Sequence, residues 1–276
     1  MKATRLPILL CTFLALSSFS CSSLLRTKPS HKQEASTLRL HDIFESIRQR
    51  NNAIQSLKAI ASIHYGAHGL GAFGSHSQAA IVARRPYYLR IDHLAEFGTL
   101  LAEVSISDGN LTIYWPNENQ YFKGLAGEEE LARYLSVALD PDKVVNLITS
   151  VIPLEKEADY RMIAKKGKII LKGNEGEITV IQQDQDYLPI YYVAYDSEGS
   201  RLYEINLQDY EKKGESEKKE GIWFPQKLSA QFLEPKAKID LEFQDLEINP
   251  LNTDDPRTNS KIFEIKIPEN AKSIDD

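Results

Sequence analysis

Apolar and polar residues alternate with a period of two along most of the chain, which is typical of an antiparallel sheet with one wet face and one apolar face. The alternation begins near Ile63 and continues to Trp115. It resumes after Arg161 and predicts further strands around 178–180, 190–192, 203–205, 228–232, 239–243 and 263–267. We therefore expect about ten to eleven strands, and a sheet of that size curls.

Two parts of the chain have helical spacing instead. Residues 39–58 carry apolar side chains three or four positions apart and predict an amphipathic helix. Residues 128–139 predict a second helix, and Pro141 is a favourable first residue for a third. The dipeptide Asp108-Gly109 predicts a hairpin turn between two strands, because both residues tolerate positive φ.

These elements predict a fold that is mainly β with an α lid. The sheet would form an open, curled antiparallel β-barrel, with the N-terminal helix and the central helical pair over its apolar face. Such a barrel either packs a solid core or encloses an apolar cavity, and the alternation is the same in both cases. The candidate cavity residues are Ile63, Ile81, Leu89, Ile91, Val104, Ile113 and Trp115.

The N-terminus follows a different pattern. Basic residues precede an apolar run over 6–16, which is shorter than the about 20 residues that span a bilayer. This arrangement predicts a signal peptide over residues 1–20. Ser20 followed by Cys21 resembles the signal of bacterial lipoproteins, although Ser18 stands where that signal usually has leucine.

Cys21 is the only cysteine beyond the signal, because Cys11 lies inside it. A lone thiol has no intramolecular disulfide partner in an oxidising compartment, and acylation would remove the thiol. We therefore predict a lipidated Cys21 at the start of a flexible tether over residues 21–38, followed by a single domain over residues 39–276. The alternative is a plain secretory signal in which Cys21 is incidental.

The charge of the chain bears on its partners. The formal charge is −6, and loss of Lys2 and Arg5 with the signal makes it −8. No basic patch stands out in the sequence, so we expect no nucleic acid as a partner. No second apolar span follows the signal, so we expect membrane attachment through the lipid on Cys21.

A glycine-rich stretch offers a rival interpretation. Residues Gly69–Gly74 match G-x-G-x-x-G, with Asp92 about twenty residues further on. A dinucleotide site needs a helix that opens at these glycines. The residues that follow alternate weakly and stop at Pro86, so a loop between two strands is the better interpretation, and we expect no cofactor.

Four histidines lie close together in the sequence, at positions 64, 68, 76 and 93. They lack the tight spacing and the cysteine or carboxylate neighbours of most zinc sites. We interpret them as ordinary surface imidazoles and expect no metal. No motif surrounds a serine or cysteine nucleophile, so we also expect no enzymatic activity, although an active site inside the barrel stays an alternative.

The order of elements and several short motifs resemble the LolA/LolB superfamily of lipoprotein carriers and receptors. The motifs are Arg84-Arg85-Pro86 followed by Leu89-Arg90-Ile91, Phe97-Gly98 before a strand, Ser107-Asp108-Gly109, and Val151-Ile152-Pro153. The resemblance implies an apolar cavity that holds the acyl chains of lipoproteins. Cys21 is similar to the anchor of the receptor (LolB) type, and Ser22 after it implies the outer membrane, on the periplasmic side.

The resemblance also implies a membrane-transfer residue. Receptors have an exposed leucine in a loop between two strands, and Phe97 matches it, whereas Glu96 replaces a proline. A carboxylate there opposes burial in an anionic membrane, and packing of Phe97 at the edge of the core is the alternative. The family suggests no role for the extra length around 158–220.

The function implied is that of a monomeric, membrane-anchored receptor for acyl chains. Its partners would be the acyl chains of lipoproteins or another lipid, the outer membrane and a periplasmic lipoprotein carrier. The alternative is an envelope lipoprotein without transport activity, which acts as a structural or partner-binding scaffold.

Overall fold

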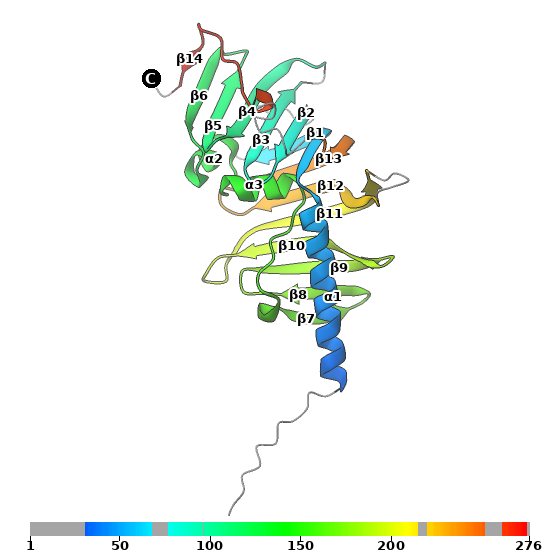
Figure 1. Ribbon diagram of the computed structural model, residues 1–276. Helices are drawn as coiled ribbons and strands as arrows, with labels where there is room; N and C mark the ends of the chain where they lie inside the picture. Colours follow the sequence, from blue (N-terminus) through cyan, green and yellow to red (C-terminus); the bar gives the residue numbers. More distant parts are fainter. Residues whose placement is uncertain (1–30, 68–76, 96, 215–219, 252–260, 275–276) are drawn as a thin grey trace, which may run out of the picture.

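The structure is a computed structural model that describes residues 31–67, 77–95, 97–214, 220–251 and 261–274. Within these ranges one sheet of 14 strands runs in the order β14-β6-β5-β4-β3-β2-β1-β13-β12-β11-β10-β9-β8-β7 (Figure 1). Neighbouring strands are antiparallel, except that β14 runs parallel to β6. The strands are β1 Ser56–Ala67, β2 Ser77–Arg84, β3 Tyr88–Leu94, β4 Leu100–Ser107, β5 Asn110–Trp115, β6 Gln120–Leu125, β7 Arg161–Lys165, β8 Lys168–Lys172, β9 Gly176–Gln183, β10 Asp186–Tyr195, β11 Arg201–Lys213, β12 Ile222–Phe232, β13 Ala237–Ile248 and β14 Lys272–Ser273.

Three α-helices accompany the sheet in the described part of the chain. They are α1 His31–Ala53, α2 Glu128–Leu135 and α3 Pro141–Ile148, and a short 3₁₀ turn covers Glu157–Asp159. Figure 1 shows α1 running across strands β7 to β10, with α2 and α3 beside the other half of the sheet. The helix α1 starts at His31, inside the segment 21–38 that the sequence suggests as a tether. None of these described helices is long and apolar enough to cross a membrane.

The predicted class, mainly β with helices, is confirmed, but the predicted strand number is wrong. The individually predicted strands do not include the hairpin β7–β8, although the alternation resumes at Arg161 and buries Ile169 and Leu171 on β8, nor β14, which has only two residues. The sheet is open, with β14 and β7 as its two edges. Strands β7 to β11 occupy the region around 158–220, so the extra length extends the sheet.

The predicted strand at 263–267 is also wrong. Phe263 is buried, but it packs against Tyr88, with 5.4 Å between the ring centroids. The Arg90 guanidinium donates to the carbonyls of Ile262 and Glu264, and Ser105 donates to the Phe263 carbonyl. Side chains of the sheet thus satisfy this segment's carbonyls, so the segment needs no strand partner.

The Asp108-Gly109 turn is confirmed. Both residues have positive φ, at +51° and +76°, and they join β4 to β5. Positive φ at both central positions matches the twist of the flanking strands. This turn fixes the register in which Val104 lies opposite Ile113.

Candidate functional site

An apolar cavity of about 130 Å³ lies between the sheet and the helical pair α2–α3. We call α2, α3 and the residues between them (128–148) the lid, and this space the lid cavity. Its walls are Ile63, Tyr65, Ile81, Leu89, Ile91, His93, Ala102, Val104, Leu135, Val137, Val144, Leu147, Ile148, Leu228, Ile239 and Leu241. Only Tyr65 and His93 bring polar side-chain atoms to these walls.

The first wall comes from the hairpins at the N-terminal side of the sheet. Ile81, Ile91 and Val104 lie directly opposite one another on β2, β3 and β4. Because side chains at paired positions point to the same face, the three form a continuous apolar row across the strands. Leu89 and His93 flank Ile91 on the same face of β3 at spacing two.

The second wall comes from the other end of the chain. Strand β1 pairs with β13, which sets Ile63 opposite Leu241 and Tyr65 opposite Ile239. Strand β12 then sets Leu228 opposite Leu241. The cavity therefore extends across the pair β1–β13, which are the first and the last long strand along the chain.

The lid forms the third wall. Leu147 and Ile148 on α3 follow Val144 by three and four residues, so they share with it the helix face that is turned toward the strands. Ser136 ends α2 with φ +53°, in the left-handed region, and the N–H of Ser136 donates to the Ala132 carbonyl. This cap breaks the lid into two helices of eight residues and turns Val137 into the cavity.

Two polar groups of the cavity wall have defined partners. The Tyr65 hydroxyl donates to the Leu135 carbonyl at 3.0 Å, which connects β1 to the end of α2. His93 Nε2 lies 2.6 Å from the Ser77 hydroxyl oxygen. Burial raises the pKa of Tyr65 and lowers the pKa of His93, so both side chains are held in their neutral forms.

The structure places five of the seven candidate cavity residues around the lid cavity, namely Ile63, Ile81, Leu89, Ile91 and Val104. Ile113 and Trp115 on β5 are not among the wall residues. Ile113 is fully buried beside Val104, and Trp115 is half-buried at the end of its strand. That any of the seven contacts an acyl chain stays a prediction.

Sequence reasoning missed the lid residues and the wall from β12 and β13. The alternation of Ile239 and Leu241 is visible in the sequence, but their position opposite β1 is not, because about 175 residues separate the two strands. The helical spacing of Val144 and Ile148 could have assigned them to the cavity face of the lid.

Phe97 lies in the loop between β3 and β4, and its side chain is 93% exposed. The Gly98 N–H donates to the Ala95 carbonyl, and the Ala95 N–H donates to the Thr99 carbonyl, both at 2.8 Å. Gly98 has φ +78°, a conformation that favours glycine. Phe97 therefore does not pack at the edge of the core, which was the alternative left open by the sequence.

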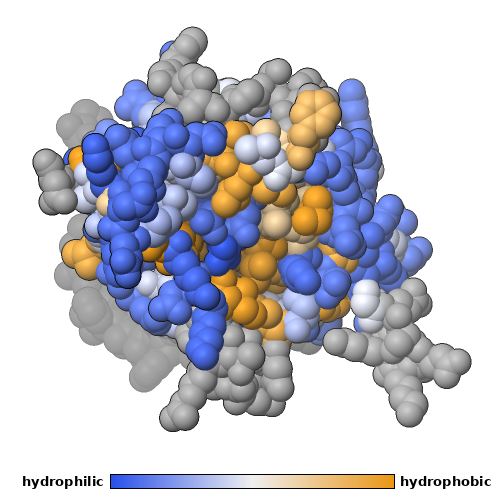
Figure 2. Space-filling view, turned by 90° about the horizontal axis from the view of Figure 1, so that it is seen from above, coloured by the Kyte–Doolittle hydropathy of each residue, from blue (hydrophilic) through white to orange (hydrophobic). Residues whose placement is uncertain are grey.

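Apolar side chains also gather on one face of the molecule (Figure 2). Figure 2, from above the view of Figure 1, shows them in the middle of one face with hydrophilic side chains around them. A contiguous apolar patch of this kind marks a binding surface more often than scattered single residues do.

Buried polar side chains join the end of α1 to the end of the lid. Arg50 Nη1 donates to the Ser150 carbonyl at 2.8 Å, and Asn51 Nδ2 donates to the Ile152 carbonyl at 2.7 Å. Arg85 Nε lies 3.2 Å from Asn146 Oδ1 on α3. Burial lowers the pKa of Arg50 and of Arg85. These contacts hold the C-terminal end of α3 in place, whereas no such cluster joins α2 to α1 among the described residues.

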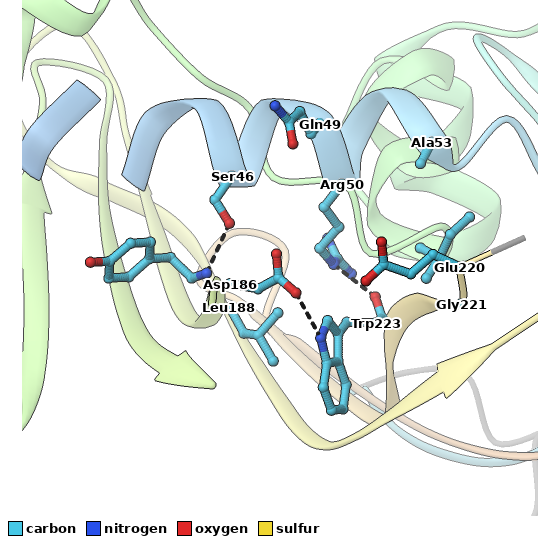
Figure 3. A pocket seen from close by; sticks show the side chains of 11 residues that line it. Ser46, Gln49, Arg50, Ala53, Asp186, Leu188, Glu220, Gly221 and Trp223 are labelled. Atoms are coloured by element: carbon cyan, nitrogen blue, oxygen red, sulfur yellow. Dashed lines mark hydrogen bonds between the residues drawn. The ribbon is translucent and has the colours of Figure 1, made fainter. Parts of the chain in front are cut away.

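A second hollow, of about 230 Å³, lies beside α1 (Figure 3). Its polar groups hydrogen-bond to one another: Ser46 accepts from the Tyr187 N–H, Trp223 Nε1 donates to Asp186, and Arg50 Nε donates to the Trp223 carbonyl. Ser46 thus fastens α1 to β10, Arg50 fastens α1 to β12, and Asp186 connects these two strands. We interpret this hollow as a structural contact between these elements.

Several predicted features lie outside the described residues: Cys21, Glu96, His68, His76 and the Gly69–Gly74 stretch. Within the described ranges, no group of three or more His, Cys, Asp or Glu residues is arranged to hold a metal ion.

No family model matches the chain, and no curated protein does. Among solved structures it is similar to a DUF1329 family protein from Desulfovibrio piger, with 12% identity and a TM-score of 0.51 over 79% of this chain and 95% of that one. It is also similar to a LolA superfamily protein from Nitrosomonas europaea, with 11% identity and a TM-score of 0.46 over 81% and 97%. A third is an outer membrane lipoprotein-sorting protein domain from Vibrio parahaemolyticus, with 9% identity and a TM-score of 0.43 over 81% and 98%.

At these identities the likeness is one of fold. The superfamily that the sequence resembles is among the structural matches, and none of the three specifies the receptor type.

Proposed function

We propose that this chain is a lipid-anchored envelope protein that binds acyl chains between its sheet and its lid. The observation that carries the proposal is the lid cavity, whose walls are apolar except for the neutral side chains of Tyr65 and His93. Each methylene that moves from water into such a space gains about 0.8 kcal/mol. The binding of an acyl chain therefore needs no covalent chemistry.

The lid cavity is too small for a whole acyl chain, so the proposal includes a movement of the lid. Ligand pockets usually measure about 300–1,000 Å³, and the lid cavity has about 130 Å³. The end of α3 is fixed by Arg50, Asn51 and Arg85, so we propose that α2 moves away from β1 to admit the chain. That movement breaks the hydrogen bond from Tyr65 to Leu135.

The location and the anchor are part of the same proposal. We propose that Cys21 is acylated and holds the protein on the periplasmic face of the outer membrane. Two or three acyl chains on one residue anchor a protein durably, whereas one does not. A periplasmic lipoprotein carrier would deliver the cargo to a monomer of this chain.

Phe97 is the proposed contact for release of the cargo into the membrane. Its loop connects β3 and β4, the strands that carry the cavity residues His93 and Ala102, and its side chain is exposed. An aromatic ring at this position would enter the interfacial region of a bilayer. Such a position would shorten the path of an acyl chain from the cavity to the membrane.

Binding is tested with the full chain carrying Cys21→Ser, which cannot be acylated, purified without detergent. Native mass spectrometry measures whether the purified protein retains lipid. Titration with a fluorescent fatty acid measures whether the probe displaces that lipid. Ile91→Glu puts a charge on the cavity wall and should reduce probe binding at least tenfold. Ile163→Glu on β7, where the side chain is already 44% exposed, is the matched control. A folded wild-type chain that takes up neither lipid nor probe would favour the scaffold function instead.

Transfer is tested separately, with the lipidated chain in vesicles. Phe97→Glu should slow movement of the probe to acceptor vesicles several-fold and leave binding in solution unchanged. Leu125→Glu replaces another highly exposed apolar side chain, on β6, and should leave transfer unchanged. Equal transfer rates for wild type and Phe97→Glu would remove the proposed role of Phe97.

A further inference from the structure

A third hollow, larger than the lid cavity and the hollow beside α1, opens on the other side of the lid. It has about 850 Å³ and lies between the lid residues Ala138, Leu139 and Lys143 and the strands β10, β11 and β12. We call it the tyrosine groove. Its volume falls within the usual range of ligand pockets, about 300–1,000 Å³, whereas the lid cavity is smaller than that range.

The floor of the tyrosine groove is an apolar row like the one in the lid cavity. Ala194, Tyr203 and Phe232 lie directly opposite one another on β10, β11 and β12. The Tyr203 ring is 5.8 Å from the Phe232 ring and 6.0 Å from the Tyr192 ring, centroid to centroid. Burial raises the pKa of both tyrosines, so their hydroxyls stay neutral and the groove floor carries no charge from them.

The groove and the cavity lie on the same face of β12. Leu228 contributes to the cavity and Phe232 to the groove, four residues further along the strand. Four residues of strand measure about 13 Å, and alternate residues share a face. The small side chain of Ala230, also buried, lies between them.

The lid residues that line the cavity and those that line the groove are close together in the sequence. Val137 contributes to the cavity and Leu139 to the groove, and both are buried. The separating segment is the connection between α2 and α3, which has no helical structure. The connection between α2 and α3 thus divides the lid cavity from the tyrosine groove, which lie on the same face of the sheet.

The rim of the groove shows which kind of ligand it suits. Leu202 and Leu233 are 46% and 37% exposed and border it. The charged side chains around it have both signs: Lys143, Arg201, Lys236, Glu128, Glu175, Asp196 and Glu234. This mixture does not select an anionic headgroup, whereas the aromatic floor selects an apolar chain.

We propose that the tyrosine groove is a second subsite for an alkyl chain, so that the protein binds ligands with two chains. One chain lies in the groove, the other enters the lid cavity, and the connecting headgroup crosses the segment between Val137 and Leu139. This inference rests on the proposed function, because it assigns the second chain of the same ligand.

The test counts alkyl chains in each space, with the full chain carrying Cys21→Ser. Native mass spectrometry with palmitate should find two molecules bound to the wild type and one to Leu202→Glu/Leu233→Glu. A two-chain phosphatidylglycerol should bind the double variant at least tenfold more weakly than the wild type. Leu125→Glu, on the far β6 strand, should behave as the wild type.

A second measurement does not depend on loss of binding. Leu233→Trp places a reporter at the groove, and a brominated fatty acid should quench its fluorescence, while Leu125→Trp should not be quenched. The second subsite would be overturned if the wild type binds ligand, Leu202→Glu/Leu233→Glu keeps the same stoichiometry and affinity, and Leu233→Trp is not quenched. Failure of the wild type to bind palmitate would instead count against the proposed function.

Discussion

The sheet has two helical covers, and they leave different interiors. The helix α1 has 23 residues, and its Ile43, Phe44 and Ile47 are fully buried against the sheet. The lid helices have eight residues each and leave a cavity of about 130 Å³. At ~1.5 Å per residue, α1 is about 34 Å long in one piece and each lid helix is about 12 Å long.

The strands under both covers have the same alternation of apolar and polar residues. The alternation therefore produces the apolar face, and we infer that the continuity of the helix above it decides whether this face packs solidly or encloses an apolar cavity. The hollow beside α1 is a separate space, in which polar groups are hydrogen-bonded to one another. A continuous helix presents large side chains at every turn. A lid that is interrupted at Ser136 cannot do so, and space remains beneath the break.

The largest loss of stability should come from a substitution in the core beneath α1. Phe44→Ala should lower the free energy of unfolding by about 3–5 kcal/mol, because the Phe44 ring packs edge-on against Tyr160 and the space cannot collapse. Val104→Ala in the lid cavity should cost only about 1–2 kcal/mol for the methyl groups lost, since a cavity already exists there. Urea unfolding of both variants measures the difference. Equal losses would show that the two regions are packed alike.

The second effect comes from filling the cavity. Ala102→Leu adds apolar atoms to the space beneath the lid and should leave stability unchanged or raise it by about 0.5–2 kcal/mol. The same change should weaken fatty-acid uptake in the lid cavity at least tenfold. Thermal unfolding and probe titration check the two outcomes together. Higher stability with unchanged uptake would mean that the chain binds elsewhere.

The fold could be predicted from the sequence where one feature decides the structure. Strands β3 to β5 follow from the alternation of apolar and polar residues, β2 follows from a weaker alternation, and the turn between β4 and β5 follows from Asp108-Gly109. Phe263 misled the prediction because its segment also alternates, yet its carbonyls are bound by Arg90. A side-chain donor from another element can replace a strand partner, and the local pattern carries no sign of it.

The site could be predicted only on the side built from consecutive hairpins. Ile81, Ile91 and Val104 meet through short turns, whereas Leu241 reaches Ile63 from the far end of the chain. Such long-range pairing depends on the whole sheet and is not encoded in a window of sequence. The division of the apolar surface by Val137 and Leu139 depends on the lid and was equally hidden.

The third effect concerns the closure of the lid. Tyr65→Phe removes the hydrogen bond to the Leu135 carbonyl, which should cost about 0.5–1.5 kcal/mol of stability. Because burial raises the pKa of Tyr65, the hydroxyl is a donor throughout the physiological range. The end of α2 should open more often in this variant, so the fluorescent fatty acid should bind faster. Stopped-flow mixing measures the rate.

Tyr134→Phe, on the same lid helix, is the control and should not accelerate binding. Unchanged association in Tyr65→Phe would place the opening movement elsewhere.

The smallest effect is a pH dependence that belongs to the cavity and not to α1. Burial lowers the pKa of His93 below its ordinary value of 6.5, so the folded protein holds the neutral imidazole. Below pH 6.5 the unfolded chain takes up a proton that the folded chain does not, and stability falls as the pH falls toward the folded pKa. Above 6.5 both states are neutral, and this contribution no longer changes with pH.

His93→Gln isolates that contribution. It keeps a partner for Ser77 but does not titrate, so its stability should decrease less than that of the wild type as the pH is lowered through 6.5. Exposed His41, whose pKa is raised by its hydrogen bond to Glu157, acts in the opposite direction and is present in both proteins. Since it cancels in the comparison, identical pH slopes for wild type and His93→Gln would show that water reaches His93 and that the lid cavity is open to solvent.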